Sequence, residues 1–319
     1  MDIGVLTVPL GDESLDDALA YLADLGVDAV ELGCGGFPGD DHLPREQYLD
    51  DEDAQADLRA TLDDHDLRVS ALATHNNPLH PGEQGEEADT ELREAIRLAD
   101  QLDVDTVTGF SGLPAGGPDD SVPNWITAPW PTEHADAHDY QWEVATDYWS
   151  DLATHADDHG VNVGIEMHPN MLVYEPTGMA RLREATNDRI GSNFDPSHLY
   201  WQGIDVTEAV RFLDDAIHHV HAKDTKVYES QSRVKGVLDT TDYTEEADRS
   251  WLFRSVGYGH GEGHWKDLVS TLRMVGYDGA LSIEHEDSLT SSREGLEKAV
   301  ELLERAVFET QPGDAYWAE

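Results

Sequence analysis

The stretch ADDHGVNVGIEM, residues 156–167, contains the unit that decides the fold. A polar helical segment stops at Gly160, and a short apolar strand follows directly, which we predict over 161–166. The same succession of helix, Gly or Asp turn and apolar strand recurs at 22–33, 63–73, 99–110 and 273–284. Recurrence of one αβ unit is typical of a repeat architecture.

On either side of this unit the sequence predicts further strands, each followed by a helical stretch. The eight predicted strands lie at 3–7, 28–32, 68–73, 105–110, 161–166, 190–195, 217–222 and 279–284. Eight such units in about 300 residues fit a (βα)8 TIM barrel, and we expect a single domain over residues 1–319. The alternative, a doubly wound open sheet, is weakened because GVLTVPLGDE (4–13) lacks the glycine-rich phosphate loop of such folds.

Two connections between predicted elements are long, namely residues 111–139 after strand four and 224–263 after strand seven. Both follow the carboxyl end of a strand, which is the catalytic face of a barrel, so we expect them to cover that face. A disordered surface loop is the alternative. Trp125 and Trp130 argue against it in the first connection, because exposed tryptophans favour a surface on which to pack.

The chain is strongly acidic, with 67 Asp and Glu against 20 Lys and Arg and a formal net charge of −47. Such a charge excludes a nucleic-acid or anionic-membrane binder that works by neutralising phosphates. Self-repulsion of this size is screened at molar salt, where the Debye length is about 3 Å. We therefore expect a protein of a high-salt cytoplasm, as in a halophilic archaeon; the alternative is an acidic protein of an ordinary cytoplasm.

Cysteine usage and hydropathy further narrow the kinds of protein that the sequence can encode. Cys34 is the only cysteine, so an intrachain disulfide and a cysteine-built zinc site are excluded. The first residues, MDIGVLTVPL, lack the basic segment of a signal peptide, and no run of about 18 apolar residues occurs. We expect a cytoplasmic protein without membrane contact.

Polar side chains end four consecutive predicted strands. These side chains are Glu166 and His168 on strand five, Asp195 and His198 on strand six, His221 and Lys223 on strand seven, and Glu284 on strand eight. In a closed barrel these ends converge on one point. A single Glu there is usually solvated and a single His usually belongs to the core, so the joint pattern carries the inference.

Carboxylates clustered in a barrel mouth would repel one another and take up protons unless a cation joined them. Three carboxylates and one imidazole, with no thiolate, favour one divalent ion: Mn²⁺ first, with Mg²⁺, Co²⁺ or Zn²⁺ as alternatives. Such an ion would act as a Lewis acid on a sugar carbonyl and stabilise an enediolate.

Five motifs extend this pattern, namely GIEMHP (164–169), NFDPSH (193–198), HVHAKD (219–224), YGHGEGHW (258–265) and SIEHED (282–287). Together they resemble the xylose-isomerase-like sugar isomerase/epimerase superfamily over nearly the whole chain. The resemblance implies a (βα)8 barrel with one catalytic divalent ion. By motif position the metal ligands it implies are Glu166, Asp195, His221 and Glu284, and His198 would contact substrate oxygens.

The related ketose 3-epimerases use their two metal-bound glutamates to exchange the proton at the reacting carbon. The resemblance therefore implies that Glu166 and Glu284 are the catalytic acid/base pair. Those enzymes carry a second Glu six residues after the first, where this sequence has Leu172, so the substrate stays open.

Other residues near the predicted strand ends are candidates for substrate binding: His75, His168, His198, Lys223 and Trp201. Each has a structural alternative. His75 could instead cap a loop, Lys223 could form an ion pair with a neighbouring carboxylate, and Trp201 could pack in the core. Glu31, at the end of strand two, either lines the site or anchors a loop.

The leading hypothesis is a metal-dependent isomerase or epimerase of a small, unphosphorylated sugar or sugar derivative. A dehydratase or lyase acting on an inosose or 3-keto-sugar shares the first step and stays open. An endonuclease-IV-like nuclease would need about three metals and more histidines, and TVTGF (106–110) ends strand four without one. A non-catalytic sugar-binding module is the last alternative. We expect no nucleic-acid partner, and a homo-oligomer is possible because such barrels often pair.

Overall fold

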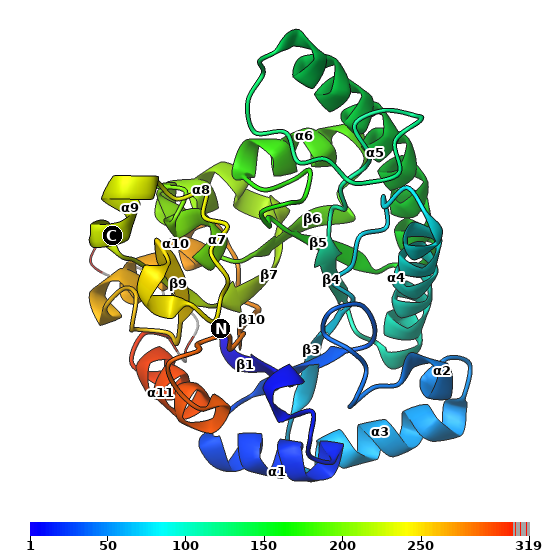
Figure 1. The fold of residues 1–319 in the computed structure, drawn as a ribbon. Coiled ribbons are helices and arrows are strands. Elements are labelled where there is room, and N and C mark those ends of the chain that lie inside the picture. Colours follow the sequence, from blue (N-terminus) through cyan, green and yellow to red (C-terminus); the bar gives the residue numbers. More distant parts are fainter. Residues whose placement is uncertain (309, 311–312, 314–316, 318–319) are drawn as a thin grey trace.

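Eight parallel strands close into a barrel in the structure, a computed structural model that describes residues 1–308, 310, 313 and 317 (Figure 1). Around the barrel the order is β1 (Asp2–Leu6), β10 (Ala280–Ile283), β7 (Ile217–Ala222), β6 (Ile190–Phe194), β5 (Asn162–Glu166), β4 (Thr106–Phe110), β3 (Arg68–Ala73) and β2 (Ala29–Gly33). Val5 of β1 closes the barrel by pairing with Ile283 and with Val30. The predicted (βα)8 barrel is confirmed, and each predicted strand agrees within one residue at either end.

Helices surround the barrel as an outer layer (Figure 1). The longer ones are α1 (Leu15–Leu25), α3 (Glu52–Asp64), α4 (Glu83–Leu102), α5 (Thr132–His159), α6 (Pro176–Ala185), α8 (Val206–Leu213), α10 (Glu262–Met274) and α11 (Ser292–Glu304). The shorter ones are η1 (Val8–Leu10), α2 (Arg45–Tyr48), α7 (Ser197–Tyr200) and η2 (Asp214–Ala216). Local signals set their ends: Ser14 caps α1 by accepting the N–H of Asp17, and Gly26 ends it with φ of 88°.

The core lies between the strands and this helical layer. β2, β4, β6 and β10 are buried along their whole length, as expected for a parallel sheet covered on both faces. One continuous apolar cluster joins strand and helix side chains around the barrel. Among the described residues, none of the helices combines the length and apolarity that crossing a bilayer requires.

The connection after β4 is shorter than the sequence suggested. Residues 132–139, which we expected in the long loop 111–139, form the first turns of α5, so the loop ends at Pro131. The segment TEHADAHD contains no Gly or Pro, and alanines together with Glu133 in the first turn favour a helix there. Trp125 packs edge-on against Tyr174, whereas Trp130 is 80% exposed.

The connection after β7 has secondary structure of its own. It contains β8 (Asp224–Val227), α9 (Glu229–Lys235), η3 (Glu246–Asp248) and β9 (Trp251–Arg254). β8 and β9 pair as an antiparallel ribbon. The buried carboxylate of Asp224 anchors the base of this ribbon. It accepts hydrogen bonds from the backbone N–H groups of Gly257, Gly259 and His260 at 3.1, 3.0 and 2.8 Å.

Candidate metal centre

Four side chains from four neighbouring strands meet at the carboxyl end of the barrel. Glu166 ends β5, Asp195 follows β6, His221 lies on β7 and Glu284 follows β10. One ligand atom from each lies within 4.8 Å of the others. Nδ1 of His221 is 3.1 Å from Oε2 of Glu166 and 3.0 Å from Oε2 of Glu284. The structure therefore brings together the four residues that the sequence suggested as metal ligands.

The geometry of this cluster fits a bound cation. Nδ1 of His221 and Oε2 of Glu284 are buried, and neither has a hydrogen-bond partner of suitable geometry. Neighbouring ligands around an octahedral ion with bonds of about 2.1 Å lie roughly 3.0 Å apart, which is the spacing seen here. Three carboxylates and one imidazole suit a hard or borderline divalent ion.

Histidines flank Glu166 on both sides. Nε2 of His75 lies 3.0 Å from its Oε2, and Nε2 of His198 lies 3.0 Å from its Oε1 and 3.2 Å from Oδ2 of Asp195. Burial raises the pKa of Glu166, but His75, His198 and His221 outweigh burial and hold that pKa well below its usual range. Glu166 is therefore an ionised carboxylate, ready to bind a cation or accept a proton.

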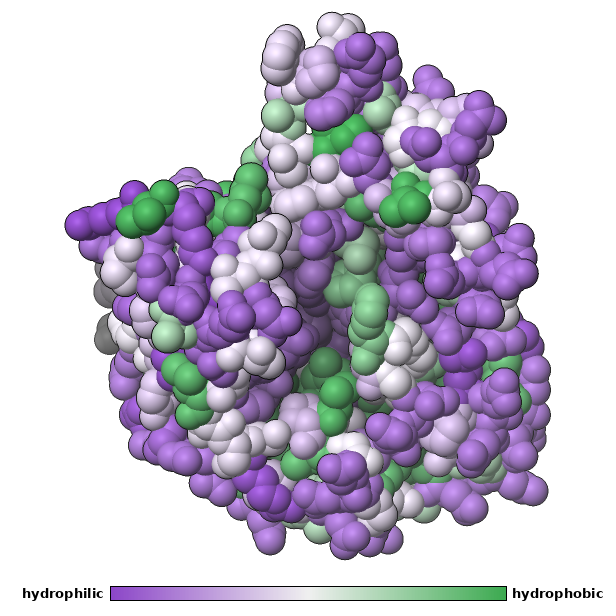
Figure 2. Space-filling view, viewed as in Figure 1, coloured by the Kyte–Doolittle hydropathy of each residue, from purple (hydrophilic) through white to green (hydrophobic). Residues whose placement is uncertain are grey.

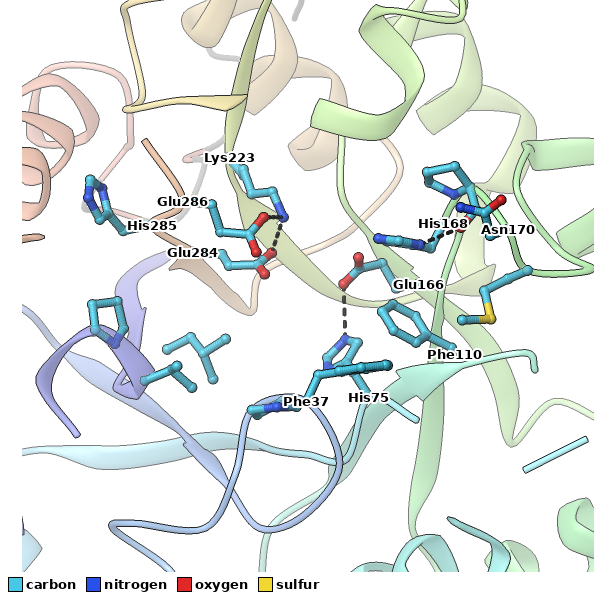
Figure 3. A pocket seen from close by; sticks show the side chains of 16 residues that line it. Phe37, His75, Phe110, Glu166, His168, Asn170, Lys223, Glu284, His285 and Glu286 are labelled. Carbon is cyan, nitrogen blue, oxygen red and sulfur yellow. Dashed lines mark hydrogen bonds and ion pairs between the residues drawn. The ribbon is translucent and has the colours of Figure 1, made fainter. Parts of the chain in front are cut away.

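Lys223 supplies a buried positive charge beside the cluster. Its Nζ lies 2.9 Å from Glu284 Oε2 and 2.7 Å from Glu286 Oε2 (Figure 3). It is also 3.5 Å from Asp195 Oδ2 and lies above the ring of Phe253. Burial lowers the pKa of Lys223, but the three carboxylates raise it well above the usual value. Burial likewise raises the pKa of Glu284, and Lys223 with His221 lowers it to about 2.

His168 presents a neutral ring to the cavity. Its Nδ1 lies 2.6 Å from the carbonyl oxygen of Pro169, which can only accept, so Nδ1 carries the proton. Burial and then the charge of His198 lower the pKa of His168 to about 3. The ring packs against Phe110 at 4.5 Å and points into the cavity (Figure 3), leaving Nε2 as an acceptor.

A cavity of about 440 Å³ opens above the cluster, and its wall is divided by polarity. Figure 2 shows the hollow at the centre of the barrel, with hydrophobic residues along part of its edge. The polar part of the wall is formed by His75, Glu166, His168, Asn170, Lys223, Glu284, His285 and Glu286. The apolar part is formed by Leu6, Val8, Pro9, Phe37, Pro38, Phe110, Pro169 and Met171.

Phe37 is held at the rim of this cavity. It is 77% exposed, and its ring lies 6.3 Å from that of Phe110. Its backbone N–H donates to the carbonyl of His75 at 2.8 Å. Gly36 before it has φ of 66°, and a side chain there would collide with the same carbonyl. The turn at Gly36 and Phe37 is thus held by a backbone hydrogen bond, and it places an exposed aromatic ring at the entrance of the cavity.

The structure places the proposed substrate-binding residues in three ways. His75, His168 and Lys223 line the cavity, whereas His198 is fully buried against Glu166. Trp201 does not line this cavity; its ring stacks on that of Trp251, with the ring centroids 5.0 Å apart. The ribbon is the physical reason. Trp251 of β9 lies against Trp201, which directly follows α7, and the contact buries both rings.

Glu31 is the supporting residue that the sequence left undecided. Its carboxylate is fully buried inside the barrel and lies within hydrogen-bond distance of four donors: Thr108 Oγ1 (2.7 Å), Ser282 Oγ (2.7 Å), His219 Nε2 (3.0 Å) and His221 Nε2 (3.0 Å). Burial raises the pKa of Glu31, but the two histidines hold it well below its usual value. Their spacing of two along β7 turns both rings inward, which was a usable signal for a buried carboxylate.

Comparison with known proteins agrees with this geometry. The family model described as "Xylose isomerase-like TIM barrel" matches residues 19–306. The chain belongs to this family. A relative from Bacillus subtilis (strain 168), "Uncharacterized protein YfiH", is 39% identical over 311 residues, covering 96% of this chain and 99% of the relative. That relative is bacterial, so it lends no support to an origin in a halophilic archaeon.

Solved structures share the fold. The probable 3-DHS dehydratase AsbF of Bacillus anthracis superposes with a TM-score of 0.69 at 14% identity, covering 95% of this chain and 99% of that one. The IOLI protein with a bound zinc atom gives 0.68 at 19% identity, covering 97% and 100%. A D-psicose 3-epimerase determined in the presence of D-fructose gives 0.61 at 13% identity, covering 96% and 98%. At these identities the likeness shows the fold alone.

Proposed function

We propose that the protein is a divalent-metal-dependent isomerase or epimerase that moves a proton next to the carbonyl of a sugar or sugar derivative. One observation carries the proposal: ligand atoms of Glu166, Asp195, His221 and Glu284 converge within 4.8 Å. Glu166 and Glu284 of this set also line the cavity. We expect Mn²⁺, with Mg²⁺, Co²⁺ and Zn²⁺ as alternatives. The zinc atom bound in the IOLI structure, which shares the fold, supports a metal-binding protein.

The chain's own groups supply the remaining chemistry. When bound, the ion would polarise a substrate carbonyl. Glu166 and Glu284 reach the floor from β5 and β10, on either side of β7, so one carboxylate can remove a proton and the other can deliver one. His75 lies beside Glu166 and can relay its proton, while the ammonium of Lys223 can donate to a substrate oxygen.

The cavity wall favours a neutral substrate. Among the described residues that line it, Lys223 is the one ammonium or guanidinium group, and carboxylates already surround it. A phosphate there would meet Glu284 and Glu286 without a free ammonium or guanidinium group to pair with. Phe37 and Phe110 suit the C–H face of an unphosphorylated sugar.

A second candidate is a dehydratase acting on an inosose or 3-keto-sugar. The two histidines beside Glu166, His75 and His198, favour it. Elimination removes a proton from one carbon and hydroxide from the next, and the hydroxide leaves as water once an acid protonates it. His75, 3.0 Å from Glu166, is placed to be that acid, and the dehydratase named among the structural neighbours supports the idea. Product analysis separates the candidates, because only elimination lowers the substrate mass by one water.

Proton exchange in D₂O tests the proposal. Ketoses and inososes incubated with the Mn²⁺-loaded protein should lose the ¹H NMR signal of a carbon next to the carbonyl. Glu166→Gln and Glu284→Gln should abolish the loss, whereas Glu297→Gln, on the exposed face of α11, should leave it unchanged. Absence of exchange with every carbohydrate and every ion above would refute the proposal. Metal stoichiometry tests the nuclease alternative, because one ion per chain fits the sugar enzyme and three fit the nuclease.

Three further expectations belong to the same proposal. We infer a cytoplasmic protein adapted to high salt, on the basis of its net charge of −47. We also infer a small-molecule carbohydrate as its partner rather than a nucleic acid or a membrane. Pairing of two barrels stays a prediction that a sedimentation measurement can check.

A further inference from the structure

We propose that Glu31 is a positioning residue that makes His221 bind the metal through Nδ1, an inference that rests on the proposed metal site. Oε2 of Glu31 lies 3.0 Å from Nε2 of His221. The opposite ring nitrogen, Nδ1, lies 3.1 and 3.0 Å from the nearest oxygens of Glu166 and Glu284. The imidazole thus bridges the buried carboxylate on one side and the candidate ligands on the other.

The position of the proton on this ring follows from hydrogen-bond chemistry. An ionised carboxylate can only accept, so Nε2 of His221 must carry the proton that it shares with Glu31. When a cation is bound between Glu166 and Glu284, Nδ1 would then be the nitrogen whose lone pair faces it. Nδ2 of Asn193 also lies 3.2 Å from Nε2, but it is within 3.3 Å of Glu166 Oε2 and can donate there instead.

Glu31 lies outside the set of four candidate ligands, and side-chain donors contact both of its oxygens. Ser282, His219 and His221 contact Oε2, and Thr108 contacts Oε1. These donors come from β4, β7 and β10, whereas Glu31 belongs to β2. The carboxylate is therefore fixed from three sides inside the barrel, and its charge behind the ring raises the basicity of Nδ1.

The substitution Glu31→Gln tests this role. It keeps the size of the side chain but removes the charge that fixes the Nε2 proton. We expect Mn²⁺ affinity, measured by EPR titration, to fall about 10- to 100-fold, the usual loss when the partner of a ligating histidine is removed. Long-range ¹H–¹⁵N spectra of the Zn²⁺-loaded protein should show coordinated Nδ1 and protonated Nε2 for His221 in the wild type, and a changed pattern in the variant.

Two further variants separate positioning from mere packing. Thr108→Val removes the contact to Oε1 and leaves Oε2 intact, so we expect less than about a threefold change in Mn²⁺ affinity. Glu31→Asp keeps the charge but withdraws the carboxylate by one methylene, so its affinity should lie between those of the wild type and Glu31→Gln. If Glu31→Gln fails to fold, the aspartate variant carries the test through the same two measurements.

The outcomes distinguish this inference from the proposed function. Wild-type Mn²⁺ affinity in Glu31→Gln, with unchanged His221 resonances, overturns the role of Glu31 and leaves the metal site standing. Coordination through Nε2 in the wild type also overturns it. If the wild type binds none of Mn²⁺, Mg²⁺, Co²⁺ or Zn²⁺, the proposed function itself fails.

Discussion

Nζ of Lys223 lies 2.9 Å from Oε2 of Glu284, the same oxygen that lies 3.0 Å from Nδ1 of His221. One carboxylate oxygen therefore faces both a fixed ammonium and the candidate metal position. The two cations would share this oxygen and repel each other across it. In the proposed site, the ammonium of Lys223 would therefore weaken metal binding while it supplies a positive charge to the substrate.

Replacement of Lys223 by Met should separate these two effects. Loss of the ammonium removes repulsion near the cation, so we expect Mn²⁺ to bind roughly three- to tenfold more tightly. Proton-exchange activity should fall about 100-fold, because a substrate oxygen loses its charged donor. EPR titration and NMR exchange rates measure the two quantities. Lys226→Met, on the exposed side of β8, is the matched control, and weaker Mn²⁺ binding in Lys223→Met would contradict the argument.

Asp195→Asn should abolish the rise in Tm that a bound metal ion causes. Ligands that bind only the folded state stabilise it, by about 2.7 kcal/mol at 100 times the dissociation constant. We expect Mn²⁺ to raise the Tm of the wild type by several degrees, and a chelator to reverse the shift. The variant should melt at the same temperature with and without Mn²⁺, whereas Asp205→Asn, at the N-cap of α8, should keep the shift. A full metal shift in Asp195→Asn would remove Asp195 from the ligand set.

Phe37→Ala should affect substrate binding without affecting the fold. The ring is 77% exposed, so its removal costs little core burial and Tm should change by less than about 2 °C. Loss of contact with a sugar face should raise KM about tenfold at similar kcat. Phe212→Ala, an exposed ring on α8, is the control. An unchanged KM would show that substrate does not reach the rim.

Salt should stabilise the protein. Its net charge of −47 creates repulsion that is screened as the Debye length shortens from about 10 Å at 0.1 M to about 3 Å at 1 M salt. We expect Tm to rise steadily with KCl up to molar concentrations. NaCl should act similarly if screening is the cause. A Tm that is flat or falls with KCl would refute adaptation to a high-salt cytoplasm.

The single thiol should be inert in the folded protein. Cys34 is fully buried, and burial raises the pKa of its thiol to about 12, so almost no thiolate forms near neutral pH. A thiol-specific chromogenic reagent at pH 8 should therefore modify none of the native chain. After unfolding in urea it should modify one thiol per chain, and rapid modification of the native protein would contradict the burial of Cys34.

The arrangement of the barrel could be predicted because its signal is repeated and local. Each strand is a similar short apolar run, and the glycines that end the preceding helices, such as Gly26 and Gly160, take the left-handed conformation. The convergence of candidate ligands such as Glu166 and Glu284 follows from the same regularity, because parallel strands in a closed barrel all end at one rim.

Other features depend on contacts between distant segments, which local patterns do not contain. Trp201 is buried because Trp251, 50 positions later, stacks on it through the ribbon. Phe37 reaches the rim because Gly36 lets its turn approach the carbonyl of His75. Glu31 contacts residues up to 251 positions away, so its role requires the closed barrel.

The carboxylate of Asp224, held by three backbone N–H groups, fixes the base of the ribbon next to the candidate metal centre. Because the main chain of residues 257–260 is fixed at that point, insertions or substitutions farther along the ribbon need not disturb Lys223 or His221. The outer part of the ribbon can therefore vary in sequence and length while the geometry of the candidate metal centre is kept.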